Sequence, residues 1–270
     1  MSSTSTETTV SGGDIGQRRR VRGYGRLISV PASLLALVVL WAVFSLWVPP
    51  DLLPPPGKVF ALGVREWNSG ALLFHVEATM GRVAAAFVVA MTIGAAIGIA
   101  LGLSKTADRA FDPWLIVALN VPALVTIVLC YLWFGLNEVA AVAAVAINKI
   151  PNVAVTLREG ARALDRGLAE MAAVYRFGRL KTLRHVILPQ LAPFLAAAAR
   201  SGIALIWKIV LVVELLGRSN GVGFQISLYF QLFDIARIFV YAIAFILVMQ
   251  TVELAILQPW ERRASRWRTI

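Results

Sequence analysis

Long apolar runs separated by short polar stretches dominate the chain from residue 27 to residue 257. Each run approaches the ~20 residues that a helix needs to cross the ~30 Å hydrocarbon core of a bilayer. We therefore predict an all-α, polytopic membrane protein with six transmembrane helices, at 27–48, 83–103, 113–134, 139–157, 191–216 and 238–257.

The connections between these runs carry their own signals. Prolines at 54–56 disfavour a helix there, and the amphipathic spacing of 58–81 predicts short helices at the outer surface. We expect a short inner loop at 104–112 and a tight outer turn at 135–138. Asn120 and Pro122 lie inside the third predicted span, and the sequence from Asn148 to Pro151 interrupts the fourth.

Two basic tails flank the predicted membrane domain of residues 27–258. Residues 1–26 begin rich in Ser, Thr and Gly, end rich in Arg, and are predicted to be disordered. Residues 259–270 form the second tail. The first apolar run exceeds the 7–15 residues of a secretory signal, so we interpret it as a membrane span.

The net charge of +11 would suggest nucleic-acid binding in a soluble protein. Here most of the 26 Lys and Arg residues lie in the two tails and in alternate connections. The excess of Lys and Arg in cytoplasmic loops predicts that both termini and the polar segment 158–189 are cytoplasmic. The positive charge is therefore read as a topology signal, and no nucleic-acid partner is expected.

The sequence motifs of catalysis and metal binding are missing from the chain. Gly57-Lys58 is followed by Val59 and does not form a phosphate loop. The two histidines, His75 and His185, lie far apart, and no metal-ligand spacing surrounds them. We predict a protein without catalytic residues, metal site or cofactor of its own.

The polar segment 158–189 carries a family resemblance. Glu170-Met171-Ala172, followed nineteen residues after the Glu by Pro189, resembles the cytoplasmic coupling motif of ABC importer permeases. Further motifs resemble the nitrate/sulfonate/taurine branch of that family over roughly residues 52–263: Leu53–Pro56, Trp133–Gly135, Pro151, Leu188–Pro193, Glu214 and Gly221–Gly223.

The resemblance implies a type I ABC importer transmembrane domain in the inner membrane of a bacterium. It implies three partners: cytoplasmic ATPase subunits that bind ATP and Mg, an extracytoplasmic solute-binding protein, and a second copy of the permease forming a homodimer. Contact with membrane lipid follows from the spans. The motif assigns ATPase coupling to Glu170, Met171, Ala172, Ala173, Arg176, Gly178, Leu188 and Pro189.

Small residues in this motif let a partner approach closely, and the surrounding cations supply charged contacts. The sequence departs from the family at two motif positions. Met171 replaces the usual Ala, and Arg176 replaces a Gly that normally ends the first helix in a left-handed conformation. We therefore expect this helix to run slightly longer, with Gly178 following.

Charged residues inside the spans are candidates for a translocation pathway. A Lys costs about 2.5–3.5 kcal/mol at the bilayer centre, so it normally faces the interior of the helix bundle. We assign Asn148, Lys149, Trp207, Lys208 and Glu214 to a pathway for a small anionic solute. The alternatives are a structural ion pair of a lysine with Glu214, or lysines that reach the membrane surface.

Glycines that recur every four residues predict close helix packing in the second span. Gly94, Gly98 and Gly102 share one helix face, where small residues allow backbones to approach in lipid. Arg200 is assigned to packing between helices.

Other functions remain compatible with parts of the pattern. A solvated basic loop bound to anionic lipid explains the charge of 158–189, though not its motif. An ion-gradient-driven secondary transporter would use Lys149, Lys208 and Glu214 as a charge relay. A membrane scaffold would have no pathway. The permease reading, with inward transport by alternating access, accounts for the most residues.

Overall fold

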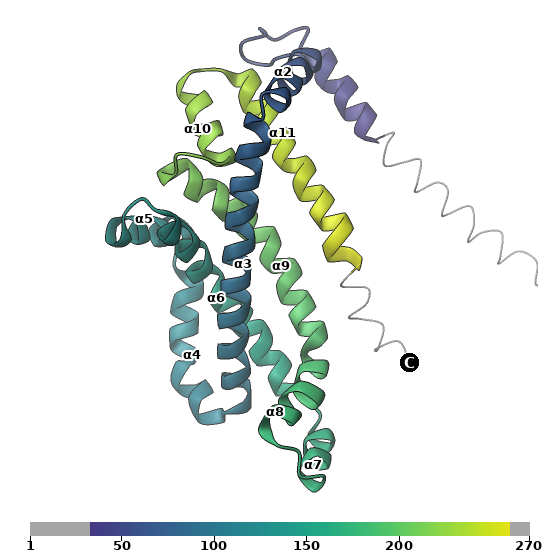
Figure 1. Cartoon of the computed structure of the whole chain (residues 1–270), viewed down its shortest axis with the longest axis vertical. Helices are drawn as coiled ribbons and strands as arrows, with labels where there is room; N and C mark the ends of the chain where they lie inside the picture. The colour runs from purple at the N-terminus through teal and green to yellow at the C-terminus, as the bar shows by residue number, and fades with distance from the viewer. Residues whose placement is uncertain (1–32, 260–270) are drawn as a thin grey trace, which may run out of the picture. The chain divides into compact units, whose positions relative to one another are not determined.

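The structure is a computed structural model that describes residues 33–259, and every element in that range is a helix. The chain divides into two compact units, residues 1–60 and 61–270. The first contains the helix Ser33–Phe44. The remaining helices, labelled in Figure 1, are α2 (Pro56–Asn68), α3 (Ala71–Leu103), α4 (Lys105–Asn120), α5 (Ala123–Phe134), α6 (Glu138–Arg162), α7 (Arg166–Val174), α8 (Arg179–Thr182), α9 (Leu188–Gly217), α10 (Val222–Gln231) and α11 (Ile235–Val252).

Four of the described helical runs are long and apolar enough to cross a membrane: Ala71–Leu103, Glu138–Arg162, Arg179–Gly217 and Ile235–Ala255. The bent pair α4 and α5 brings the count to five if both form one broken span. The six predicted spans are therefore not all recovered. The first, 27–48, begins outside the described residues, as do most of the two predicted tails, and Ser33–Phe44 is shorter than a span.

The second predicted span starts earlier than its hydropathy indicates. Instead of surface helices up to residue 81, α3 begins at Ala71 and carries Arg82 in its interior. The start of α2 at Pro56 suits a proline, whose missing N–H has no partner in the first helical turn anyway.

The predicted loop 104–112 is also helical. Ser104 alone separates α3 from α4, and its hydroxyl accepts a hydrogen bond from the Ala107 N–H, at 3.3 Å between Oγ and N. This short cap turns the chain back beside α3, so two helices meet at one tight corner.

Two prolines within predicted spans have opposite effects. The third predicted span breaks at Val121-Pro122, where α4 and α5 meet at 94°. Val121 is extended, as expected for a residue whose helical conformation clashes with a following proline ring. Pro151, by contrast, lies inside a continuous α6, so the predicted interruption of the fourth span is wrong.

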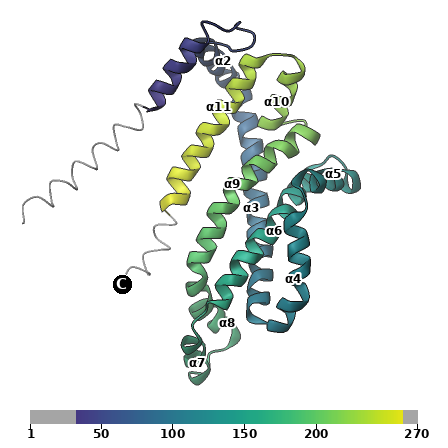
Figure 2. The ribbon, with the colours of Figure 1, turned by 180° about the vertical axis from the view of Figure 1, so that it is seen from behind.

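Helices α3, α6 and α9 lie side by side and form the centre of the larger unit (Figures 1 and 2). The glycines at every fourth position of α3 lie against α6. A Cβ added to Gly98 would come within 2.3 Å of the Ala154 carbonyl oxygen, and one on Gly94 within 2.7 Å of Val153 Cβ. The absence of side chains at these positions lets the two backbones approach closely.

Helix α9 begins in a wider helical turn that continues from α8. Leu183–Ile187 is π-helical, and the Leu188 N–H bonds the Leu183 carbonyl. Pro189 has no N–H to bond the carbonyl four residues earlier, which favours such a local adjustment. The run from Arg179 to Gly217 is consequently one continuous helix of 39 residues.

Candidate functional site

Helix α7 is a short helix held at both ends by hydrogen bonds. The Asp165 carboxylate accepts from the Gly167 N–H, at 2.7 Å between Oδ1 and N. The Asp165 N–H in turn donates to Gln190 Oε1 at 2.9 Å, which fastens the start of α7 to the start of α9. These bonds give α7 a defined position beside the α8–α9 run.

The end of α7 is a Schellman motif with arginine where glycine is usual. The Phe177 N–H donates to the Ala172 carbonyl at 2.8 Å, and the Arg176 N–H donates to the Ala173 carbonyl at 3.0 Å. Arg176 has φ 51°, in the left-handed region. The expected lengthening of this helix is therefore wrong: Arg176 adopts the conformation that glycine normally supplies, and α7 ends at Val174.

The surface of α7 is divided differently from the sequence prediction. Ala172 is only 2% exposed, so it packs against the chain's own residues and is not available for close approach by a partner. Glu170 and Ala173 are exposed. Four exposed apolar side chains, which we call the apolar face of α7, accompany them: Leu168, Met171, Val174 and Tyr175.

The remaining motif residues flank α7 along the chain. Gly178 precedes α8 in an extended conformation, and Leu188 and Pro189 are exposed at the start of α9. Lys181 places its ammonium group 4.2 Å from the centre of the Phe177 ring, which joins α8 to the end of the Schellman motif. The motif thus surrounds two short helices at one end of the bundle, seen at the bottom of Figure 1.

The two lysines assigned to a pathway lie in different surroundings. Lys149 is 2% exposed, between α6 and α9, with its Cε 3.3 Å from the place a Cβ on Gly202 would occupy. No hydrogen bond or ion pair to it occurs within the described part of the chain. Lys208 is exposed, six residues after Gly202 and so about 120° around α9 from it.

The residues near these lysines take part in packing and ion pairs between helices. Trp207 is buried, with its ring centre 6.0 Å from that of Phe245 on α11, and Asn148 is half-buried. Arg200, assigned to helix packing, forms an ion pair with Glu253 after α11, at 3.6 Å between Nε and Oε1. Within a single chain, the five predicted pathway residues do not lie together in one site.

Glu214 lies in a separate, buried polar cluster at the other end of the bundle. It is fully buried, and its Oε1 accepts from Arg82 Nη1 at 2.6 Å. Arg82 also binds Glu138 through two bonds of 2.7 and 2.8 Å and contacts Asn220. The alternative of an ion pair between Glu214 and a lysine is therefore wrong, because α3 supplies the cation.

The same cluster holds the first backbone N–H groups of α10. The N–H groups of Gly221, Val222 and Gly223 donate to His75 Nδ1, Thr79 Oγ1 and Glu214 Oε2, at 3.0, 2.8 and 2.8 Å. These are groups that a helix start leaves without internal partners. A Cβ on Gly221 would fall 2.3 Å from the Glu214 carboxyl carbon, so this close approach requires glycine.

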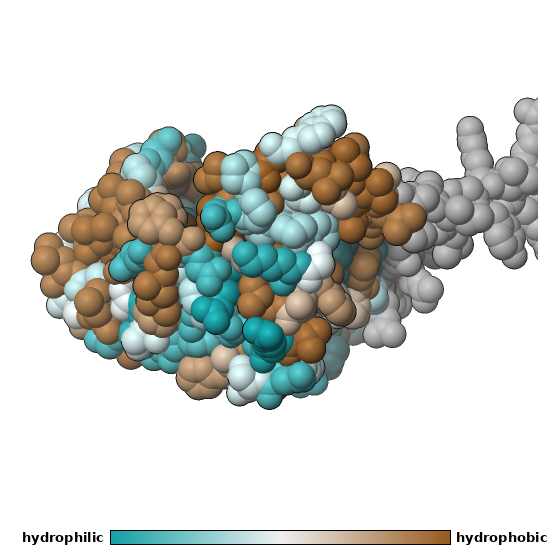
Figure 3. Space-filling view, turned by 90° about the horizontal axis from the view of Figure 1, so that it is seen from above, coloured by the Kyte–Doolittle hydropathy of each residue, from teal (hydrophilic) through white to brown (hydrophobic). Residues whose placement is uncertain are grey.

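Sequence reasoning missed the residues that complete this cluster. Arg82, Thr79 and His75 lie in a stretch predicted as surface helix and connection, and only the extension of α3 brings them under α10. Seen from this end, hydrophilic side chains gather near the middle of the surface (Figure 3). The sequence did offer one signal: Arg82 lies alone at the edge of an apolar run, and an arginine in that position needs an acidic partner.

Comparisons with known proteins agree with this architecture. Residues 90–257 match the family described as binding-protein-dependent transport system inner membrane component. The putative aliphatic sulfonates transport permease protein SsuC of Bacillus subtilis is 29% identical over 252 residues, covering 93% of this chain and 90% of that protein. The taurine transport system permease protein TauC of Escherichia coli is 27% identical, covering 74% and 75%.

Two further matches extend the comparison. The bicarbonate transport system permease protein CmpB of Synechococcus elongatus is 25% identical, with 72% of this chain and 74% of that protein covered. A crystal structure of an amino acid ABC transporter with histidines matches the fold with a TM-score of 0.57 and 23% identity, covering 75% of this chain and 97% of that one.

Proposed function

The chain belongs to the family of binding-protein-dependent transport system inner membrane components, and we propose that it moves a small anionic solute inward by alternating access. Its role is that of an ABC importer permease, a transport subunit and not an enzyme. ATP and Mg are bound by the partner ATPase, and a solute-binding protein delivers the solute from outside. Both termini lie in the cytoplasm of a bacterial cell.

The apolar face of α7 is the observation that carries this proposal. Val174 and Tyr175 are 79% and 71% exposed on a nine-residue helix next to basic residues, and Leu168 and Met171 extend the same surface. Apolar side chains grouped on a polar segment mark a protein contact. The ATPase covers this face, with Glu170 beside it, and its movements reach α9 through the Asp165–Gln190 bond.

Co-purification and uptake test the contact. In cells that produce the complete transporter, Glu170→Lys and Val174→Asp should abolish both ATPase co-purification and ATP-driven uptake, with the permease still inserted in the membrane. The control removes two cations of the same segment, Arg179→Gln with Lys181→Gln, and should retain most of both. ATPase binding that persists in Val174→Asp would defeat this proposal, and loss of binding in the control alone would show that the cations, not the apolar face of α7, hold the ATPase.

Lys149 supplies the positive charge for the anionic solute. The relatives' names give aliphatic sulfonates, taurine and bicarbonate, which all carry an anionic group. A buried lysine without an acidic partner is expensive in a membrane and is therefore expected to serve function. Lys149→Met should retain folding and ATPase binding but lose uptake; unchanged uptake of sulfonate, taurine and bicarbonate would remove Lys149 from the pathway.

Lys208 lies on a face of α9 that a second copy of the chain would cover. Ser201, Ala204 and Lys208 are exposed along this face, and polar residues there suit a pathway shared by two copies. Ala204→Cys in a Cys130→Ser background should form a cross-linked homodimer in membranes, and Lys208→Met should reduce uptake. Cross-linking absent at Ala204 but present at an α4 position such as Trp114→Cys would place the interface elsewhere.

The secondary-transport alternative has less support. Its charge relay needs Glu214 near the two lysines, whereas Glu214 is enclosed by Arg82, Thr79 and α10. Uptake by the purified chain without ATPase or ATP would restore that alternative.

A further inference from the structure

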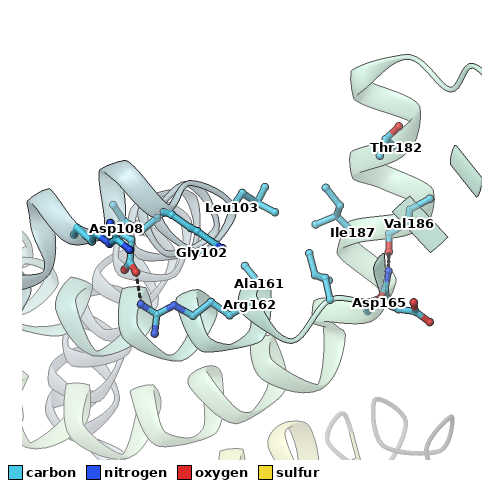
Figure 4. A pocket seen from close by; sticks show the side chains of 14 residues that line it. Gly102, Leu103, Asp108, Ala161, Arg162, Asp165, Thr182, Val186 and Ile187 are labelled. Carbon is cyan, nitrogen blue, oxygen red and sulfur yellow. Dashed lines mark hydrogen bonds and ion pairs between the residues drawn. The ribbon is translucent and has the colours of Figure 1, made fainter. Parts of the chain in front are cut away.

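A pocket of ≈ 590 Å³ lies beside the start of α7 and the α8–α9 run (Figure 4). Three parts of the chain enclose it: the corner between α3 and α4, the last turn of α6, and the stretch from Thr182 to Gln190. Leu103 and Ile187 extend toward each other from opposite sides of the pocket (Figure 4). This volume lies in the range of small-molecule sites, about 300–1,000 Å³.

The carboxylates of the pocket already have partners. Asp108 accepts hydrogen bonds from Arg158, at 3.4 Å between Nη1 and Oδ1, and from Arg162. Asp165 accepts from the Gly167 N–H as the cap of α7. The charge of Asp108 is therefore compensated by two arginines, and the Asp165 carboxylate is engaged as a helix cap.

Two cations of the pocket remain without carboxylate partners. Lys105 and Arg109 lie four residues apart on α4, so their side chains share one helix face. Both are exposed, and neither forms an ion pair or hydrogen bond within residues 33–259. The pocket thus offers an uncompensated positive rim to a ligand.

The apolar side of the pocket adjoins the ends of two candidate spans. It is formed by Leu101, Leu103, Ala161, Leu164 and Ile187. Leu103 is the last residue of α3, and Arg162 is the last of α6. A ligand that fits must carry an anionic group for the rim and apolar chains that continue along the helices.

We propose that this pocket binds the headgroup of an anionic phospholipid, with its phosphate at Lys105 and Arg109 and the start of its acyl chains against Leu103. The proposal rests on the cytoplasmic location given under the proposed function. Basic pockets between membrane helices on the cytoplasmic side are suited to such headgroups. An occupied pocket touches α4 on one side and Val186 and Gln190 on the other, and so fixes the position of the α8–α9 run relative to α4.

Phospholipid retention by the purified full chain tests the site. Native mass spectrometry after exchange into detergent with phosphatidylglycerol or phosphatidylcholine should show selective retention of phosphatidylglycerol. Lys105→Gln with Arg109→Gln should weaken this retention about 30-fold, which corresponds to about 2 kcal/mol. The matched control, Arg179→Gln with Lys181→Gln, removes the same charge outside the pocket and should change retention less than threefold.

A second variant separates the cavity from its charge. Leu103→Trp fills part of the pocket while all cations remain, and should also reduce retention; Leu124→Trp, at a similarly exposed position on α5, should not. Equal retention of both lipids, or no effect of the double charge variant and of Leu103→Trp, would overturn the proposal.

A competition arm identifies the source of the phosphate. Glycerol phosphate in millimolar excess should not displace phosphatidylglycerol if the acyl chains contribute to binding. Complete displacement would mean that the site recognises a soluble phosphate ester, and the lipid proposal would be wrong. None of these measurements requires the ATPase or uptake. A failed coupling test at Glu170 would therefore not change the result for lipid binding.

Discussion

Arg82 Nη1 and Glu214 Oε1 are 2.6 Å apart in the interior of the protein, and this ion pair joins the first half of α3 to the end of α9. Arg82 is shared with Glu138 on α6, so three helices depend on one guanidinium group. Glu214 also binds the Gly223 N–H and Thr79. The pair therefore fixes the start of α10 on the helix bundle.

Removing Arg82 should cost more stability than removing Glu214. Arg82→Met leaves a fully buried carboxylate without its cation, a loss of about 3–5 kcal/mol. Glu214→Leu leaves Arg82 paired with Glu138 and should cost less. Thermal unfolding in detergent measures both, and the double variant should regain part of the loss of Arg82→Met. A double variant less stable than Arg82→Met would show that loss of the ion pair with Glu214 is not the main cause of the destabilisation.

Arg176→Gly should stabilise the end of α7. A non-glycine residue in the left-handed region costs roughly 1–2 kcal/mol, and Arg176 is exposed with φ 51°. Hydrogen exchange of the Arg176 and Phe177 amides should slow by about tenfold. Arg176→Ala also removes the charge but keeps the left-handed strain, so it should exchange like the natural protein; equal slowing in both variants would refute the backbone explanation.

A larger side chain should lower the stability of the protein at position 172 but not at position 173. Ala172→Leu overfills a buried position and should destabilise the chain by about 1–3 kcal/mol. Ala173→Leu places the same side chain on an exposed position and should leave thermal unfolding unchanged. Comparable unfolding temperatures for the two variants would contradict the inward orientation of Ala172.

Two glycines of α3 offer a matched pair for helix packing. Gly98→Ala would bring a methyl group against the Ala154 carbonyl of α6 and should destabilise the protein by about 1–3 kcal/mol. Gly81→Ala meets no atom within 4 Å and should be neutral or stabilising by up to about 1 kcal/mol, through better helix propensity. Unfolding temperatures in that order would support the close contact of α3 with α6.

The apolar pattern predicted the all-helical architecture and the approximate positions of α3, α6, α9 and α11. It failed where polar residues lie within helices. Residues 71–81 have an amphipathic pattern because they include His75 and Glu77, and residues 105–112 predict a loop because they are polar, yet these two stretches form the starts of α3 and α4. Hydropathy reports where a chain meets lipid, whereas helix ends depend on caps such as Ser104 and on backbone restrictions such as that at Val121.

The structure places the predicted coupling motif on and around the short helices α7 and α8, but the orientation of its residues was not predictable. A nine-residue helix can bury any of its faces, and the sequence alone did not indicate that Ala172 points inward while Val174 and Tyr175 point out. Arg82 was overlooked for a related reason. Its partners Glu138 and Glu214 are 56 and 132 residues away, and a pairing over such separations follows from the packing of α3, α6 and α9.

The continuous helix from Arg179 to Gly217 is longer than a bilayer core is thick, and it connects the two ends of the helix bundle. At 1.5 Å per residue its 39 residues extend about 58 Å, more than the ~30 Å thickness of the hydrocarbon core. Near one end, Gln190 accepts a hydrogen bond from the Asp165 N–H before α7. Near the other end, Glu214 accepts one from the Gly223 N–H of α10. Because the helix is continuous between them, a displacement of the end beside α7 is expected to be accompanied by a displacement of the end that holds α10.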